Sequence, residues 1–207
     1  MPFIKTIPVA EAADDVLAMY ERQEGAWGYV PDYAKVFCHR PEVMARWGKM
    51  LAEIKRSVDA RCLELVTFAA AYELKNSSCS LAHGAALARI IGKDAVMAIV
   101  DGREADVLTD AEVAMMNYAR RVAKDASKIT SGEVAALREI HGFADQEIFD
   151  IAAIAASRSF FTKVLDALGS EPDPGFMKLD RDLRRALTIG RPISCAKLEH
   201  TARRRVA

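Results

Sequence analysis

The amino-acid sequence predicts an all-α protein that folds as a compact helical bundle. Alanine is abundant and signals for the start and end of helices recur along the chain. No long alternating run of β-branched residues bounded by turns, the pattern of a half-buried strand, is found. With 207 residues, of which 51% are hydrophobic, the chain can fill one good-sized core or two small ones. We expect one domain that spans 1–207.

Within this domain the pattern divides the chain into two helical halves and a tail. The first half covers about 1–104, the second about 105–170 and the tail 171–207. A degenerate duplication of one helical unit is an alternative origin of the two halves. The tail has less periodicity, and we expect it to wrap over the body or over a neighbouring subunit.

Helices of the first half are delimited by caps and by punctuating residues. Asp59 and the Asn-Ser-Ser stretch before Cys79 are favourable N-caps, Pro41 suits a first helical turn, and Gly92 suits a helix end. A loop with the sequence EGAWGYVPDYA is expected after the first helix. The predicted helices are Val9–Tyr20, Pro41–Lys55, Asp59–Leu74, Cys79–Ile91 and Asp94–Val100.

Two capping boxes open helices in the second half. Thr109 precedes Glu112, and Thr130 precedes Glu133, in the S/T-x-x-E pattern that satisfies backbone N–H groups at a helix start. A long third helix is expected to stop at Gly169. The predicted helices are Thr109–Lys124, Thr130–His141 and Asp145–Leu168.

The overall charge makes nucleic acid and anionic membrane surfaces poor partners. Lysine plus arginine equals aspartate plus glutamate, at 29 each. A small molecule or a protein is the expected partner. The N-terminal stretch has no signal-peptide core and no apolar run approaches membrane-spanning length, so we expect a soluble, cytoplasmic protein. The four cysteines lack paired metal-type spacing and are expected to be free thiols.

Three residues form the strongest candidate site. Cys79 and His83 are four residues apart and share a helix face, and Glu64 lies on the preceding, antiparallel helix. A helix N-terminus and a nearby imidazole both favour the thiolate, the nucleophilic form of cysteine, so we expect a reactive Cys79 oriented through His83 and Glu64. From the residues alone two other interpretations stay open: a buried core pair, or a metal site with three ligands.

Other candidate residues are assigned to packing. Cys62 lies about 200° around its helix from Glu64, so it is expected to face away from Cys79. The aromatic residues Trp27, Tyr29 and Tyr33 are expected to form a buried cluster, with a pocket mouth as the alternative. The run Arg203 to Arg205 is interpreted as a solvated, frayed terminus.

The stretch ELVTFAAAYELKNSSCSLAHG resembles the core motif of the alkylhydroperoxidase D-like family, which includes carboxymuconolactone decarboxylases. The peroxidase form of that motif is Glu, eleven residues, then Cys-x-x-Cys-x-x-x-His. Glu64, Cys79 and His83 match in register. Similarity to the longer, peroxidase-related members extends over nearly the whole chain, through GYVPDYAKVFCHRPEVMARWGKML, LTDAEVAMMNYARRVAKD, EIFDIAAIAASRSFFTKVLDALG and LTIGRP. The resemblance implies an all-α fold and a homo-oligomer.

The resemblance also implies a function for each matched residue. Cys79 would attack a peroxide, His83 would transfer protons, and Glu64 would hold the histidine. Asn76 replaces the first cysteine of the pair, and Ser78 stands where family peroxidases can carry a second histidine. The expected protein is therefore a one-cysteine, antioxidant thiol peroxidase, with no cofactor and no metal, that depends on an external thiol reductant or on Cys38 or Cys195.

Two further functions are alternatives to the peroxidase. In the first, Glu64 and His83 perform acid–base chemistry on a small carboxylated or lactone substrate, as in the decarboxylase relatives, and Cys79 only lines the pocket. In the second, the chain is a helical oligomer whose degenerate pocket binds a ligand or a partner.

Overall fold

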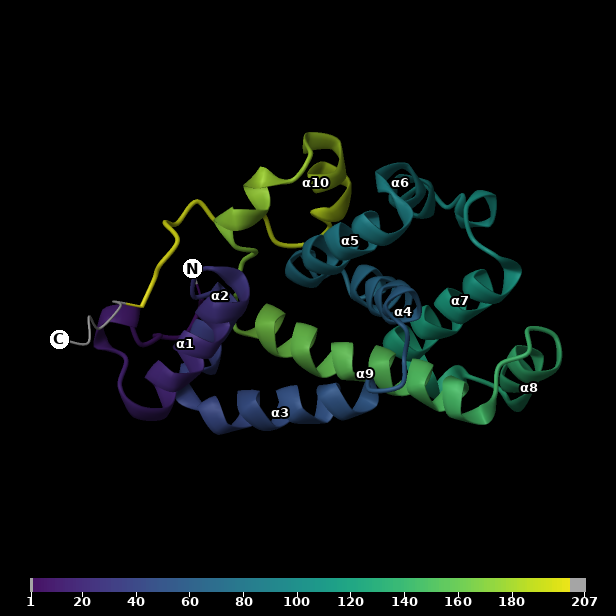
Figure 1. Cartoon of the computed structure of the whole chain (residues 1–207), viewed down its shortest axis with the longest axis horizontal. Coiled ribbons are helices and arrows are strands. Elements are labelled where there is room, and N and C mark those ends of the chain that lie inside the picture. The colour runs from purple at the N-terminus through teal and green to yellow at the C-terminus, as the bar shows by residue number, and fades with distance from the viewer. Residues whose placement is uncertain (1, 202–207) are drawn as a thin grey trace.

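The computed structural model describes residues 2–201, and in this part of the chain the regular structure is helical (Figure 1). An isolated bridge between Val30 and Glu199 is the only β-type pairing among these residues. The all-α prediction is confirmed. The helices are α1 (Asp14–Trp27), α2 (Asp32–Val36), α3 (Pro41–Ile54), α4 (Ala60–Glu73), α5 (Ser77–Ile91), α6 (Lys93–Val100), α7 (Asp110–Asp125), α8 (Ser131–Glu139), α9 (Asp145–Ala167) and α10 (Arg181–Leu187).

The predicted helix caps are present where the sequence places them. The Asp59 side chain accepts hydrogen bonds from two backbone N–H groups at the start of α4, and Asn76 accepts one from the N–H of Cys79 at the start of α5. Thr109 and Thr130 form complete capping boxes. These bonds satisfy N–H groups that have no partner inside the helix, which is why the helix starts are predictable from local sequence.

The first predicted helix is wrong in its position. Val9–Glu11 is a short 3-10 turn, and α1 begins only at Asp14 and continues to Trp27, through part of the expected loop. Acidic residues in the first turn favour this start because they face the positive end of the helix dipole. Gly28, with φ of 79°, ends the helix in the left-handed conformation that glycine adopts without strain.

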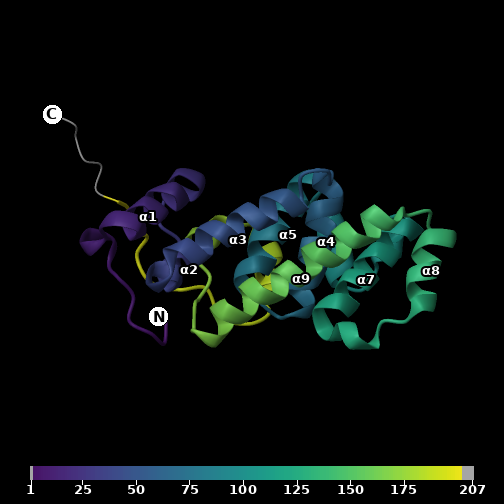
Figure 2. The ribbon, with the colours of Figure 1, turned by 90° about the horizontal axis from the view of Figure 1, so that it is seen from below.

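Two hydrophobic clusters form the interior. The larger one lies between α4, α5, α7 and α9, and the smaller one is covered by α1, α2 and α3. Helix α9 runs beside α3 and also contacts α4 and α7, so it borders both clusters (Figures 1 and 2). Cys79 belongs to the smaller cluster.

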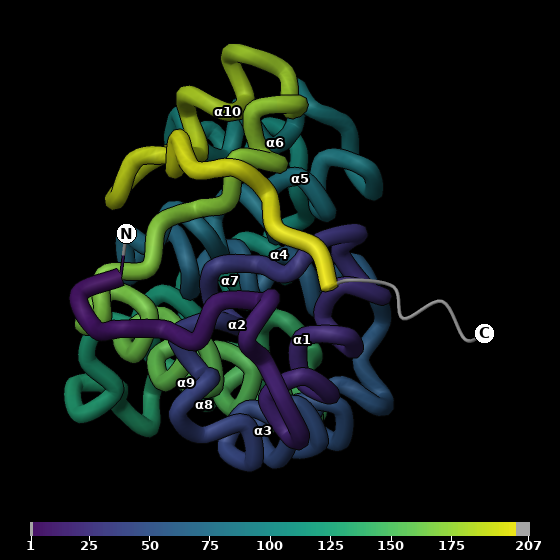
Figure 3. The backbone as a smooth tube through the Cα atoms, turned by 90° about the vertical axis from the view of Figure 1, so that its left-hand side faces the viewer, coloured from purple at the N-terminus to yellow at the C-terminus, as the bar shows by residue number. Residues whose placement is uncertain are grey.

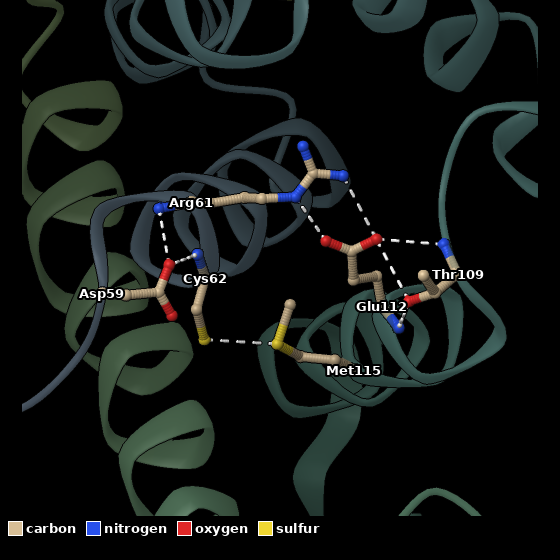
Figure 4. A network of polar contacts seen from close by, with 6 residues as sticks. All are labelled: Asp59, Arg61, Cys62, Thr109, Glu112 and Met115. Atoms are coloured by element: carbon tan, nitrogen blue, oxygen red, sulfur yellow. Dashed lines mark hydrogen bonds and ion pairs between the residues drawn. The ribbon is translucent and has the colours of Figure 1, made fainter.

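A polar network joins the N-termini of α4 and α7 (Figure 4). Arg61 forms an ion pair with Glu112, which also closes the capping box of Thr109. The Cys62 sulfur lies 3.3 Å from the Met115 sulfur, on the α7 side of α4. Cys62 therefore faces away from Cys79, as predicted.

The segment after α10 crosses one end of the molecule (Figure 3). Gly190 donates its N–H to the Ser77 hydroxyl at 2.7 Å, and Ser194 donates its N–H to the carbonyl of Pro172 at 2.8 Å. The segment then reaches α2, where Glu199 pairs with Lys35 at 2.9 Å. The tail thus wraps over the body of its own chain; the run Arg203 to Arg205 lies outside the described residues.

No helix in the described part of the chain combines the length and the apolar character needed to cross a bilayer.

Candidate active site

The predicted site residues come together through the antiparallel pair α4 and α5. Glu64 on α4 accepts a hydrogen bond from His83 on α5, with 2.8 Å between Oε2 and Nδ1. Cys79 lies one turn before His83, in the first turn of α5, where its backbone N–H donates to Asn76 Oδ1 at 2.8 Å. Asn76, in place of a cysteine, therefore serves as the N-cap of the helix that carries the thiol.

A buried arginine completes this group. Arg158 on α9 is 4% exposed and donates from Nη1 to His83 Nε2 at 3.3 Å. Its positive charge also acts on the Cys79 thiol and lowers the pKa of that group, against the effect of burial. Because an arginine only donates, His83 Nε2 must be the accepting nitrogen, and the ring proton lies on Nδ1 toward Glu64. The contact thus fixes the neutral tautomer of the histidine.

Sequence reasoning missed Arg158, although a signal for it exists. It is the only charged residue within 151–161, and it falls on the stripe of buried residues that includes Ile151, Ile154, Phe161 and Leu165. A single cation on the apolar face of a helix is seldom buried without a specific partner.

Two aromatic rings lie close to the Arg158 guanidinium. Its central carbon lies 5.2 Å from the Trp47 ring centre and 5.6 Å from that of Phe161. The two rings themselves stack at 4.5 Å. Such cation–π contacts compensate part of the cost of burying the charge. In the part of the chain that is described, no carboxylate forms an ion pair with this arginine.

The thiol and the imidazole open into one cavity of about 160 Å³. Its walls are mostly apolar, and Trp27 and Tyr33 belong to them, so the pocket-mouth alternative describes these two rings better than a buried cluster does. Tyr29 packs beside Trp27, with 6.5 Å between ring centres, and lies outside the lining. The lining residues are Trp27, Tyr33, Met44, Trp47, Leu51, Ser78, Cys79, Ala82, His83, Arg158, Phe161, Asp173 and Phe176.

Burial sets the protonation of the thiol. It raises the pKa of Cys79 to about 11, and the nearby Arg158 opposes this shift while Asp166 adds to it. The expected thiolate, favoured by the helix N-terminus and by His83, is therefore not the resting form. The removal of water from around the sulfur is the largest cause of the shift, because burial disfavours the charged form of the thiol.

The histidine is also held neutral. Burial lowers the pKa of His83, Glu64 opposes the shift through its hydrogen bond, and the positive charge of Arg158 reinforces it. A neutral imidazole whose Nε2 carries a lone pair can accept a proton. The resting site thus pairs a protonated thiol with a neutral base, beside a fixed cation.

The other cysteines lie elsewhere. Cys38 is buried, Cys62 faces α7, and Cys195 is exposed on the tail; all three are free thiols, as predicted. The three-ligand metal interpretation of Glu64, Cys79 and His83 finds no support in the geometry, since among the described residues no cluster of three or more histidine, cysteine or carboxylate ligands has metal-binding geometry.

Comparisons with solved structures identify the fold that carries this site. No protein-family model and no curated protein sequence matches the chain. A peroxidase-related protein from Ralstonia eutropha JMP134 with an alkylhydroperoxidase AhpD core shares 24% identity over 84% of this chain and 94% of its own, with a TM-score of 0.70. A peroxidase-related protein from Silicibacter sp. TM1040 shares 20% identity over 83% and 92%, with a TM-score of 0.72.

The debrominase Bmp8 shares the same architecture. It is 15% identical over 84% of this chain and 92% of its own, with a TM-score of 0.67. At these identities the comparisons establish the fold and leave the activity to be argued from the site. The chain therefore has the alkylhydroperoxidase D-like fold that its Glu64, Cys79 and His83 motif predicted.

Proposed function

We propose that the protein is a one-cysteine thiol peroxidase that reduces apolar organic hydroperoxides. The observation that carries the proposal is that Cys79, the neutral His83 and a buried arginine line one cavity, where Arg158 contacts His83 Nε2 at 3.3 Å and its charge lowers the pKa of the thiol. This arrangement offers a nucleophile, a base that is oriented by a carboxylate, and a cation for developing negative charge. The mostly aromatic and aliphatic cavity walls favour an apolar substrate.

The reaction begins with proton transfer from the thiol. His83 Nε2 gives up its 3.3 Å hydrogen bond from Arg158 and takes the proton of the Cys79 thiol. Glu64 then stabilises the resulting imidazolium through the hydrogen bond to Nδ1. The guanidinium then faces the thiolate. Because the thiol's pKa is raised by burial, the thiolate forms only transiently, and Arg158 lowers the free energy of that state.

The thiolate then attacks the terminal oxygen of the hydroperoxide. A sulfur–oxygen bond forms, the oxygen–oxygen bond breaks, and the electron pair leaves on the alkoxide. Cys79 is oxidised to a sulfenic acid and the peroxide is reduced to an alcohol once the alkoxide takes a proton.

Reduction of the sulfenic acid requires thiols from outside the site. Asn76 cannot form a disulfide with Cys79, Cys62 faces α7, and Cys38 is buried beside Tyr20. One external thiol releases water and forms a mixed disulfide, and a second thiol restores Cys79. Without this reductant, further peroxide oxidises the sulfenic acid to sulfinic acid.

The decisive experiment is intact mass spectrometry after one equivalent of cumene hydroperoxide, with a sulfenic-acid trap and peptide mapping. We expect the trap on Cys79 and not on the exposed Cys195, although solvent access alone favours the latter. Cys79→Ser is expected to abolish peroxide consumption and Cys195→Ser to leave it unchanged. An unmodified Cys79 would overturn the peroxidase and favour the acid–base or ligand-binding alternatives, in which Cys79→Ser retains function.

A second set of variants tests the oriented base. Glu64→Ala removes the acceptor that holds Nδ1–H of His83, so we expect a loss of peroxide reduction. The matched control is Glu112→Ala, which removes another partly buried, ion-paired glutamate that lies at the start of α7, away from the cavity. Full activity without Glu64 would contradict the relay.

Removal of a halogen from an aromatic ring is the second candidate function. A cysteine-to-alanine variant of the debrominase Bmp8 that shares this fold, with 14% identity and a TM-score of 0.67, contains bound 2,3,4-tribromopyrrole. The observation in this chain that favours it is the ring of aromatic side chains around Cys79. Bromide release from a brominated pyrrole, in the presence of a thiol, that disappears in Cys79→Ser would support this function over the peroxidase.

A further inference from the structure

Asp173 brings a carboxyl group into the cavity that holds Cys79. It lies between Pro172 and Pro174, in the connection between α9 and the 3-10 turn Pro174–Lys178, and is 6% exposed. The two prolines restrict the backbone on either side, which places the carboxyl group with little freedom. In the sequence this stretch is recognisable only as a break between helices.

The groups around Asp173 come mainly from α2, and one of them holds an oxygen of its carboxyl group. Oδ1 accepts the backbone N–H of Asp32 at 2.8 Å. The charged neighbours are the Asp32 carboxylate and the Lys35 ammonium, both on α2. Lys35 bonds to Asp32 Oδ1 and to Glu199 of the tail, each at 2.9 Å, so its positive charge is shared between two other carboxylates.

Two phenols complete the surroundings, namely Tyr29 before α2 and Tyr33 within it, and burial keeps both in the protonated form by raising their pKa. Burial likewise raises the pKa of Asp173 to about 7, with the Asp32 charge adding to the shift and the Asp32 N–H and Lys35 opposing it. A substantial fraction of Asp173 therefore carries a proton near neutral pH.

His83 is badly placed to supply the proton that a peroxide's leaving oxygen needs. In the resting site its only ring proton is on Nδ1, which donates a hydrogen bond to Glu64, and Nε2 accepts a hydrogen bond from Arg158. Once it has taken the Cys79 proton it stabilises the thiolate as a neighbouring cation. A separate acid in the same cavity allows proton acceptance and proton donation to occur on different groups.

We propose that Asp173 is the general acid that protonates the leaving alkoxide. This role rests on the proposed peroxidase function. As the sulfur–oxygen bond forms and the oxygen–oxygen bond breaks, the alkoxide takes the Asp173 proton and leaves as an alcohol. Cys79 becomes a sulfenic acid, Asp173 a carboxylate and His83 an imidazolium; transfer of one proton from His83 to Asp173 through solvent restores the resting state.

Two oxidants separate this role from a structural one. Cumene hydroperoxide releases a strongly basic alkoxide that needs a proton, whereas peroxyacetic acid releases acetate, which leaves without one. Asp173→Asn keeps an oxygen that can accept the Asp32 N–H but has no acidic proton. We expect this variant to oxidise Cys79 about 100-fold more slowly with cumene hydroperoxide, measured in single turnovers, and at nearly the wild-type rate with peroxyacetic acid.

Asp166→Asn is the matched control. Asp166 is a partly buried carboxyl group on α9 whose charge adds to the raised pKa of Cys79, and it lies outside the cavity lining. Its removal acts through the thiol and should change the rates with both oxidants by the same factor. An equal loss with both oxidants in Asp173→Asn, or no loss with cumene hydroperoxide, would overturn the assignment.

The wild-type protein gives an independent measurement if Asp173→Asn does not fold. Both oxidants react with the Cys79 thiolate, so the fraction of thiolate enters both rates equally and cancels in their ratio. We expect the cumene hydroperoxide to peroxyacetic acid ratio to decrease as the pH rises through about 7, where Asp173 loses its proton. A constant ratio would exclude the general acid. If neither oxidant modifies Cys79, the peroxidase function fails, and the role of Asp173 fails with it.

Discussion

Arg158 places Nη1 3.3 Å from His83 Nε2, and it lines the same cavity as Cys79, whose pKa its charge lowers. One residue from α9 thus affects both the tautomer of His83 and the electrostatic environment of Cys79. Its charge opposes the effect of burial, which raises the pKa of the thiol to about 11.

Removal of the Arg158 charge is expected to slow the reaction of the Cys79 thiol with peroxide. Arg158→Met keeps much of the apolar stem but loses the cation, so the pKa of Cys79 should rise further, and reaction with cumene hydroperoxide near neutral pH should fall by about 10-fold or more. Arg158→Lys should recover part of the rate because an ammonium restores the charge without the planar fork. Stopped-flow single turnovers measure the rates.

Arg191→Met serves as the control for the Arg158 variants. Arg191 also covers an aromatic ring, with its central carbon 4.8 Å from the Phe3 ring centre, but it does not line the cavity. The rate at which Arg191→Met reacts with cumene hydroperoxide should stay near that of the wild type. Equal losses in the two methionine variants would show that the effect is not specific to the site.

Asn76→Cys should provide the missing partner for Cys79. Asn76 occupies the position of the first cysteine in the Cys-x-x-Cys motif of the family that this sequence resembles. It is the N-cap of α5, and its Oδ1 accepts a hydrogen bond from the Cys79 N–H at 2.8 Å. We expect peroxide to convert the variant to an intramolecular disulfide, detected as the loss of two hydrogens in the intact mass. The lost cap should also reduce the free energy of unfolding by about 1 kcal/mol.

Asn76→Ser is the matched variant because serine retains a capping oxygen and has no thiol. It should fold with nearly wild-type stability and should progress to sulfinic acid when peroxide is in excess. Accumulation of sulfinic acid in Asn76→Cys as well, with no disulfide, would contradict the predicted geometry.

Gly190→Ala should destabilise the protein through a backbone clash. A Cβ atom at this position would lie 2.1 Å from the Lys75 carbonyl oxygen, directly before the start of α5. The tail must then move away and lose the Gly190 to Ser77 hydrogen bond. We expect a loss of about 1–3 kcal/mol in urea unfolding.

Gly48→Ala adds the same methyl group at an open, exposed position within α3. Here alanine should stabilise the protein by about 0.5–1 kcal/mol because glycine loses more backbone entropy in a helix. If Gly190→Ala were as stable as the wild type, or more stable, close contact between the tail and Lys75 would be excluded.

The partly buried His83 and the buried Asp173 should make stability depend on pH in opposite directions. The pKa of His83 is lowered on folding, so the unfolded chain binds more protons below about pH 6.5 and stability falls as the pH falls through that value. The pKa of Asp173 is raised to about 7, so the folded protein binds the extra proton and stability falls as the pH rises from about 4 to about 7.

Single variants separate these contributions in urea unfolding measured across that range. His83→Gln removes the first contribution, so its stability should fall more steeply, or rise less, with increasing pH than that of the wild type. Asp173→Asn removes the second and should show the reverse. Identical pH dependences in all three proteins would contradict both protonation states.

Local sequence was sufficient to place the helices whose ends are set by nearby hydrogen bonds. Asp59, Asn76, Thr109 and Thr130 cap helices where the pattern places them, because a cap and the N–H groups it satisfies are at most three residues apart. The first helix was misplaced because no side chain caps its start at Ala13. The pairing of Glu64 with His83 was also predictable, since helical spacing and a short connection suffice to bring them together.

The groups that surround the thiol, by contrast, are set by the folded chain. Arg158 and Asp173 reach the cavity from distant parts of the sequence, and no local pattern specifies their approach to Cys79. The protonation of the thiol was predicted with the wrong sign for the same reason. A helix N-terminus is visible in the sequence, whereas the loss of solvation, the largest cause of the raised pKa of Cys79, depends on which side chains close around the sulfur.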